Sequence, residues 1–164
     1  MAVKKTVEKS ADDERFMRLA IEAAREAGER GDVPVGAVIV KGGTVLASSG
    51  NRRHTEPDPT AHAEIVVMRE AAKIIGNWRL DDCALYVTLE PCPMCAGAMV
   101  NARLPRLVYG APDPRAGAVE SLYKIVQDKR LNHRIEVSAG VLSGECADIL
   151  SEFFAKRRRK GTKD

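Results

Sequence analysis

Two short segments of this sequence bring together residue types that bind metals and move protons. The first is His62-Ala63-Glu64, and the second is Pro91-Cys92-Pro93-Met94-Cys95. An imidazole nitrogen and two thiolate sulfurs form a ligand set suited to Zn²⁺. Because Cys92 and Cys95 are three residues apart, both sulfurs point the same way from the first turn of a helix. Three protein ligands leave one position of a tetrahedral zinc open, and a carboxylate beside it completes the composition of a hydrolytic centre.

Each segment has a plainer explanation when it is taken alone. A single Cys-x-x-Cys can be a redox pair or half of a zinc finger, and a histidine at a helix start is often a surface or capping residue. We interpret Cys83 and Cys146 as small apolar core residues, and His54 and His133 as solvated side chains. No fourth ligand then stands at a conventional spacing, which favours a catalytic centre over a closed structural one.

The spacing of His62 and Glu64 restricts where they can meet. Residues two apart face nearly opposite ways on a regular helix, so both reach one site only at the open end of the helix, in its first turn. Asp58 followed by Pro59 predicts such a helix start. The cysteine segment also begins a predicted helix, and two converging helix N-termini would stabilise thiolates and developing negative charge.

The remaining elements are expected to position these two segments. Helices and strands alternate along the chain, which argues for an α/β fold with a mixed sheet covered by helices on both faces. We expect residues 1–11 to form a flexible N-terminal tail, residues 12–159 a single domain that carries the zinc site, and residues 160–164 a basic C-terminal tail. Periodicity predicts helices over 12–28, 59–75, 91–101 and 145–159, a weaker one over 119–126, and strands over 34–40, 45–48, 84–89, 107–110 and 135–141.

Length, composition and charge narrow the class of protein. The 164 residues are 45% hydrophobic and 30% charged, as expected of one packed domain. No apolar stretch approaches the roughly 20 residues of a transmembrane helix, and the N-terminus lacks the apolar region of a secretory signal. We therefore expect a soluble, intracellular protein without a membrane partner. The net charge is +3, but Lys156–Lys160 is a block of cations. This block fits a solvated helix end, a phosphate-contacting patch or, less well, a nuclear localisation signal.

His-x-Glu followed by Pro-Cys-x-x-Cys is the signature of zinc nucleobase deaminases, in which the glutamate moves protons and is not a ligand. Over about residues 12–159 the sequence resembles the bacterial tRNA-specific adenosine deaminases, which convert adenosine at the first anticodon position to inosine. The resemblance rests on Val33–Val38, Asn51 with Arg52, Thr60–Glu64, Leu85–Cys92, Cys95–Met99, Tyr109–Ala111 with Asp113, Asn132–Arg134 and Phe153-Phe154.

This resemblance implies a cytidine deaminase-like, three-layer α/β/α fold with a five-stranded mixed sheet. It implies one Zn²⁺ per subunit, held by His62, Cys92 and Cys95, with Glu64 as the catalytic proton shuttle. It also implies a cytoplasmic homodimer that binds the anticodon stem-loop of tRNA across its subunits. The residues expected to contact the target nucleotide or the RNA are Asn51, Asp113, Phe154, Arg157 and Arg158.

Two other functions share these motifs. One is a deaminase of a free base or nucleoside, such as guanine or cytosine, on the same zinc core; Phe153-Phe154 before the basic block favours RNA instead. The other is a non-catalytic RNA-binding domain with structural zinc, which the missing fourth ligand and Glu64 argue against. Pro112, Glu120 and Ala155 depart from the residues usual in the family, and these departures concern RNA contacts rather than the chemistry.

Overall fold

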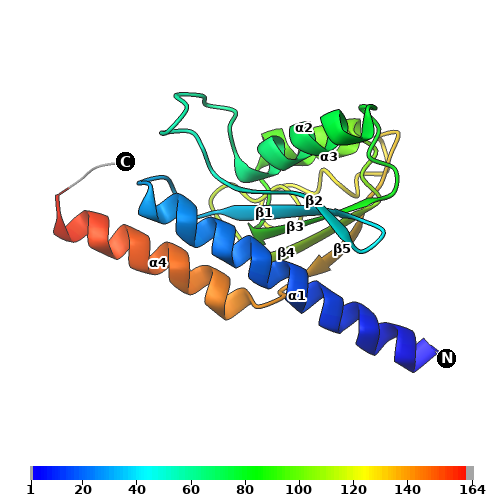
Figure 1. The fold of residues 1–164 in the computed structure, drawn as a ribbon, viewed down its shortest axis with the longest axis horizontal. Coiled ribbons are helices and arrows are strands. Elements are labelled where there is room, and N and C mark those ends of the chain that lie inside the picture. The colour runs from blue at the N-terminus through cyan, green and yellow to red at the C-terminus, as the bar shows by residue number, and fades with distance from the viewer. Residues whose placement is uncertain (1, 162–164) are drawn as a thin grey trace.

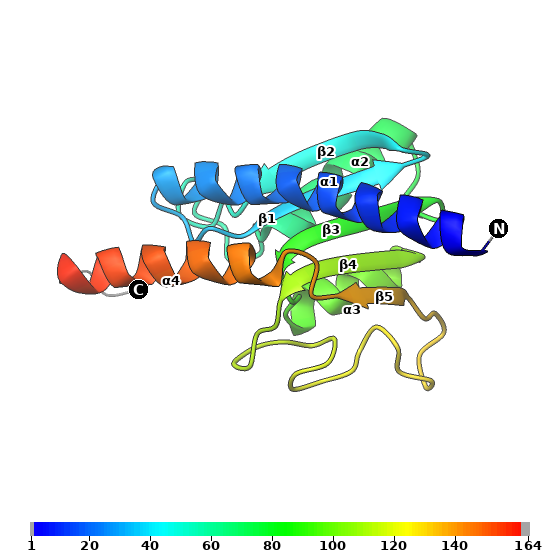
Figure 2. The ribbon, with the colours of Figure 1, turned by 90° about the horizontal axis from the view of Figure 1, so that it is seen from below.

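The computed structural model describes the backbone of residues 2–161 and the side chains of residues 11–161. Its elements, in chain order, are α1 (Ala2–Glu29), β1 (Gly36–Lys41), β2 (Thr44–Gly50), α2 (Ala63–Ile75), β3 (Cys83–Leu89), α3 (Pro93–Asn101), β4 (Arg106–Ala111), β5 (Glu136–Ala139) and α4 (Ser143–Arg159). The strands form one sheet in the order β2-β1-β3-β4-β5. Helices α1 and α4 cover one face of it, and α2 and α3 cover the other (Figures 1 and 2).

The sheet is mixed, because β1 runs opposite to the other four strands. Strand β1 pairs antiparallel with β2 and β3, whereas β3, β4 and β5 run parallel. Helices cover both faces, so β3 is apolar almost throughout, as is usual for a strand buried on two sides. Its alternate side chains enter different cores: Leu85 and Val87 pack toward α2 and α3, and Tyr86 packs toward α1. The predicted three-layer α/β/α fold with a five-stranded mixed sheet is confirmed.

A buried ion pair fixes α1 to the sheet at the end opposite the carboxyl end of β3. Both carboxylate oxygens of Asp13 accept hydrogen bonds from the guanidinium of Arg106 on β4, each at 2.7 Å. The Tyr86 hydroxyl also donates to Asp13, at 3.0 Å. Two parallel hydrogen bonds between a guanidinium and a carboxylate fix their relative orientation as well as binding strongly. The pair therefore holds α1 in one position over β3 and β4.

The two ends of the chain differ from what the sequence predicted or lie partly outside the structure. We expected the first helix to begin at Asp12, but α1 begins at Ala2, so the backbone of residues 2–11 is helical. The flexibility of that segment and the domain boundaries stay predictions. Of the expected basic tail, residues 162–164 lie outside the described residues. Within residues 2–161, no helix has both the length and the apolar character needed to cross a membrane.

Two internal predictions were also wrong. Helix α2 begins at Ala63 rather than Pro59, because Asp58 accepts hydrogen bonds from the backbone N–H and hydroxyl of Thr60, at 2.8 and 2.7 Å. Asp58 thus makes a local turn instead of capping a helix, an alternative open to every aspartate. Residues 119–126 form turns and no helix.

Candidate active site

The starts of α2 and α3 carry the predicted metal ligands. His62 is the N-cap of α2 and Cys92 is the N-cap of α3, and both have extended backbones (φ −67°, ψ 148° and φ −75°, ψ 173°). An N-cap residue lies outside the regular helix, so His62 and Glu64 escape the opposite-face constraint and reach the same end of α2. Cys95 lies in the first turn of α3. The two helix N-termini therefore meet at one point.

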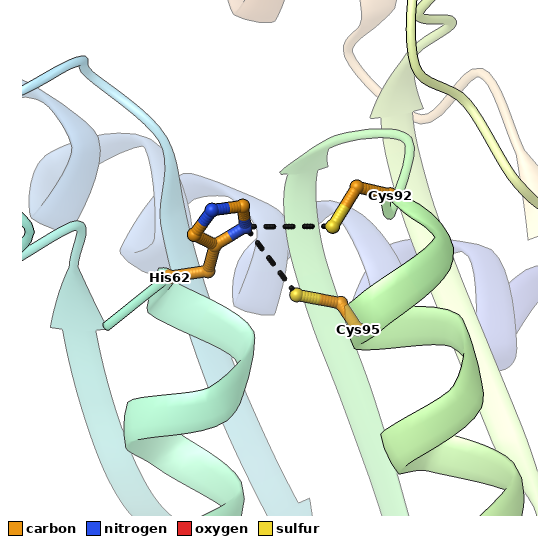
Figure 3. A group of neighbouring side chains, drawn as sticks. All are labelled: His62, Cys92 and Cys95. Carbon is orange, nitrogen blue, oxygen red and sulfur yellow. Dashed lines mark hydrogen bonds between the residues drawn. The ribbon is translucent and has the colours of Figure 1, made fainter. Parts of the chain in front are cut away.

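Three candidate ligand atoms converge there (Figure 3). Nδ1 of His62 lies 3.6 Å from Sγ of Cys92 and 3.5 Å from Sγ of Cys95. In the described part of the chain, these residues form the group of histidine, cysteine and acidic side chains placed to hold a metal ion, with ligand atoms within 4.8 Å of one another. One imidazole and two sulfurs fit Zn²⁺, and a set of three leaves a coordination position open.

Hydrogen bonds within the cluster prepare one cysteine for metal binding. The Cys95 thiol donates to Cys92, and this bond, together with that to His62, lowers the pKa of Cys92 to about 4. The same bond raises the pKa of Cys95, and the bond to Cys92 raises the pKa of His62. These shifts favour the thiolate form of Cys92, which is the form of cysteine that binds metals.

Glu64 supplies a carboxyl group beside the cluster. It is 3% exposed and lines a cavity of about 170 Å³ together with His62 and Cys92. Burial raises the pKa of Glu64, while a nearby charge on His62 opposes that rise. A buried carboxyl group with a raised pKa suits a general acid and base, which must both take and release a proton.

Asn51 borders the same cavity and also supports α2. Its Oδ1 accepts a hydrogen bond from the backbone N–H of Ala63 at 2.9 Å. The His62 side chain makes no capping bond, so Asn51 satisfies the first N–H of the helix from outside it. This bond leaves the His62 ring available as a metal ligand.

The other four predicted contact residues line one groove. Asp113, Phe154, Arg157 and Arg158 border a space of about 570 Å³ between α4 and the loop that follows β4. Asp113 also lines the 170 Å³ cavity, so the groove and the cavity adjoin. The Arg157 guanidinium lies 4.6 Å above the centre of the Phe153 ring and donates to the Gly31 carbonyl at 2.7 Å.

A buried carboxylate that we did not predict as a site residue organises the loop after β4. Glu90 is 2% exposed, and its oxygens accept hydrogen bonds from the backbone N–H groups of Asp113, Val119, Glu120 and Ser121, at 2.9–3.1 Å. The Ser121 hydroxyl donates to it as well. Burial would raise the pKa of Glu90, but these hydrogen bonds outweigh it and lower the pKa to about 2.

Other bonds in this loop explain why residues 119–126 are not helical. The N–H groups of Leu122 and Tyr123 donate to the Gly117 carbonyl, and that of Ile125 donates to the Ala118 carbonyl, so none of them bonds to the carbonyl four residues earlier as in an α-helix. The one sequence signal for the role of Glu90 was its position directly before Pro91-Cys92; its partners lie more than 20 residues further along the chain.

Asp32 holds the loop on the other side of the cavity. Its side chain is fully buried, and Oδ2 accepts hydrogen bonds from the N–H groups of His54 and Thr55, at 3.1 and 3.4 Å. Oδ1 has no hydrogen-bond partner among the described residues. Oδ2 thus helps to hold the loop between β2 and α2, which brings Asn51 and Arg53 to the cavity. The sequence offered no sign of this role.

The remaining cysteines and histidines lie outside the cluster. Cys83 and Cys146 are buried in the core and His54 is exposed, as predicted. The prediction for His133 was wrong, because its ring is half-buried and Nε2 lies 2.7 Å from the Leu104 carbonyl oxygen.

Comparison with known proteins agrees with this arrangement. Residues 11–158 match the MafB19-like deaminase family. The chain is 49% identical to the tRNA-specific adenosine deaminase of Bacillus subtilis over 148 residues, which cover 90% of this chain and 92% of that protein. It is 51% identical to a solved tRNA:A34 deaminase from work on A-to-I editing at the wobble position, with a TM-score of 0.81 over 83% of this chain and 99% of that one.

A less similar solved structure is that of a guanine deaminase. The chain is 35% identical to the guanine deaminase from Bacillus subtilis, with a TM-score of 0.60 over 92% of this chain and 97% of that one. Identity and structural agreement are both greater with the tRNA deaminases. The chain therefore belongs to the tRNA-specific adenosine deaminases, within the MafB19-like deaminase family.

Proposed function

We propose that this protein hydrolyses adenosine to inosine at the first anticodon position of tRNA and releases ammonia. Its relatives, named for this activity, match nearly the whole chain. The single observation that carries the proposal is the cluster of His62, Cys92 and Cys95, which lies with the buried Glu64 at one small cavity. A free base enters such a cavity directly, and a base in RNA enters it after leaving its stack.

His62, Cys92 and Cys95 would hold one Zn²⁺ per subunit. When bound, zinc supplies a Lewis acid that lowers the pKa of water from about 16 toward 7. Glu64 takes a proton from the attacking water and delivers it to N1 of adenine as the new C–O bond forms at C6. Glu64 then takes the second proton from the new C6 hydroxyl and gives it to the amino group. The C6–N bond breaks and ammonia leaves, so adenosine and water yield inosine and ammonia.

The groove beside the cavity gives the RNA a place to bind. Phe154 offers an aromatic surface on which an unpaired base can stack, and Arg157 and Arg158 offer cations for phosphates. Asp113 lies where the groove meets the cavity and would contact the target nucleotide or its neighbour. Unstacking a base costs least in a single-stranded segment, which favours an anticodon loop as the substrate.

We also propose that the protein is a cytoplasmic homodimer, the cytoplasm being the compartment of its tRNA substrate. The outer side of α2 and α3 carries an apolar groove of about 320 Å³, lined by Ile65, Met68 and Trp78 among others. Trp78 is 60% exposed, and a second copy would cover it. Light scattering at several protein concentrations tests this: a dimer that Trp78→Glu converts to a folded monomer supports the proposal, and a monomeric wild type refutes it.

The deciding experiment for the activity is incubation of zinc-loaded protein with an anticodon stem-loop that carries adenosine at the first anticodon position. Inosine is detected by mass, with Glu64→Ala and a loop carrying guanosine at that position as controls. We expect inosine with the wild type and none with Glu64→Ala, which retains its fold and its zinc. Turnover of free guanine or cytosine without turnover of the stem-loop would instead establish the free-base reaction.

A further inference from the structure

Arg53 is a cationic side chain at the cavity that the mechanism above does not use. It lies on the loop between β2 and α2 and lines the cavity together with Glu64 and Asp113. Its Nε is buried and has no hydrogen-bond partner in the described part of the chain. Native proteins rarely leave a buried donor unsatisfied, because its lost hydration is not replaced. The guanidinium thus lines the cavity without a protein partner for its charge among the described residues, and an anionic ligand in the cavity would supply one.

The preceding residue, Arg52, differs from Arg53 because it has partners within the protein. Arg52 lies 3.4 Å from the Glu56 carboxylate and 3.7 Å from that of Glu70, so protein groups neutralise its charge at the surface. No hydrogen bond or ion pair of that kind is found for Arg53 within residues 11–161. Two consecutive arginines on one loop therefore differ in whether the protein itself supplies their partner.

The backbone around Arg53 is held in place. The next residue, His54, donates its N–H to the buried Asp32 at 3.1 Å, and the Arg53 carbonyl accepts a hydrogen bond from the N–H of Asp58 at 3.2 Å. A ligand that binds Arg53 therefore does not have to order the backbone that carries it, which reduces the entropic cost of binding.

The charges at the cavity indicate the chemistry of that ligand. Three carboxylate residues line it, Glu64, Glu90 and Asp113, and Arg53 is the one lysine or arginine that lines it among the described residues. A nucleotide whose base enters this cavity brings the phosphates of its chain to the rim, where carboxylates repel them. A guanidinium attracts phosphate and matches its oxygens with paired N–H groups.

Building on the proposed function, we propose that Arg53 binds a backbone phosphate next to the target adenosine and so positions that nucleotide for entry of its base. A neutral free base carries no such group, so Arg53 would favour a nucleic-acid substrate over a free base. Its contribution is to binding and register, since phosphate contacts position a nucleic acid without reading its sequence.

The test compares Arg53→Gln with Arg52→Gln in the zinc-loaded protein, using the stem-loop as substrate. For Arg53→Gln we expect KM to rise roughly tenfold with kcat within about twofold, as for loss of one charge-assisted hydrogen bond to substrate. We expect the KM of Arg53→Lys to lie between those of the wild type and Arg53→Gln, because an ammonium keeps the charge but lacks the paired N–H groups of the guanidinium. Arg52→Gln should keep KM within about twofold, and equal melting temperatures would exclude a folding defect.

A modified substrate separates phosphate binding from an indirect effect. Stem-loops with a neutral methylphosphonate linkage on the 5′ or the 3′ side of the target adenosine remove one phosphate charge each. One of these should raise the wild-type KM about as much as Arg53→Gln does, and should have no further effect on Arg53→Gln. If Arg53→Gln and Arg52→Gln behave alike while the wild type makes inosine, the Arg53 proposal is overturned and the proposed function stands. If the wild type makes no inosine, both are overturned.

Discussion

A buried carboxylate helps to attach each of the two loops beside the cavity to the core, but the two carboxylates accept very different numbers of hydrogen bonds. Glu90 holds the loop after β4 through four backbone N–H groups and a hydroxyl, with both oxygens occupied. Asp32 holds the loop before α2 through two N–H groups on one oxygen, and its other oxygen has no partner in the described residues.

This difference indicates how firmly each side of the site is placed. Several hydrogen bonds to one charged group reinforce each other in a buried setting, so the loop carrying Asp113 should move as one unit with Glu90. The loop carrying Arg53 receives fewer and longer bonds from its carboxylate, so less of its attachment should depend on that one side chain. The two walls of the cavity therefore differ in how strongly each relies on a single buried carboxylate.

Replacing Glu90 should have the largest effect. Glu90→Gln removes the charge and directs an amide NH₂ toward N–H donors, so we expect a loss of about 3 kcal/mol in the free energy of unfolding. Activity on the stem-loop should also fall roughly tenfold, because Asp113 loses its anchor. Urea unfolding and inosine formation measure the two effects, with the exposed Glu22→Gln as control. A variant as stable as the control would contradict the role given to Glu90.

Acid should produce a similar loss in the wild type. The pKa of Glu90 is lowered from 4.5 to about 2 in the folded protein, so its contribution is fully present above pH 4.5 and is lost as the pH falls toward 2. The shift corresponds to about 3 kcal/mol. Unfolding free energies measured from pH 6 to pH 2 should decline more steeply for the wild type than for Glu90→Gln. Parallel curves would show that Glu90 titrates normally.

Gly117 tests the packing of the same loop without changing any charge. A Cβ at this position would collide with the carboxyl group of Glu90 and lie 2.5 Å from the Asp113 carbonyl oxygen. We expect Gly117→Ala to cost about 2 kcal/mol in thermal or urea unfolding, as for other overpacked sites. Gly144→Ala is the matched control, because nothing lies within 4 Å of its added methyl group. Equal stability of the two variants would mean that the loop can shift to accommodate the added methyl group at little cost in free energy.

Asp32→Asn should have the smallest effect of the four. The amide keeps one acceptor oxygen for the N–H groups of His54 and Thr55, so we expect a loss of about 1 kcal/mol in unfolding free energy. Hydrogen exchange at these two N–H groups should speed up, while exchange in the loop held by Glu90 stays slow. A loss as large as that of Glu90→Gln would remove the contrast between the loops.

The sequence predicted the cluster of candidate metal ligands because the signal for it is local. Cys92 and Cys95 are separated by one helical turn, and His62 stands at a helix start, so residue type and spacing were sufficient. The alternation of elements likewise predicted the layered sheet. The anchors were not predictable in this way, since Glu90 and Asp32 bind backbone groups, which every sequence offers, at positions set by the tertiary fold.

The same reasoning explains the misplaced helices. At Asp58 one residue type signals both a helix cap and a tight turn, and the choice depends on where the chain must go next. Over residues 119–126 the apolar spacing suited a helix, but the N–H groups of Leu122 and Ile125 donate to the carbonyls of Gly117 and Ala118 instead of to those four residues earlier. Residue type and spacing alone did not distinguish the two outcomes in either case.

The manner in which Glu90 holds its loop also bears on how this enzyme can evolve. Its bonds to Asp113, Val119 and Glu120 run to main-chain N–H groups, which every amino acid except proline supplies. Mutation can therefore exchange the side chains at these positions while the loop keeps its path over the cavity. A scaffold of this kind can acquire new substrate preferences through single substitutions, without first having to rebuild the wall that presents them.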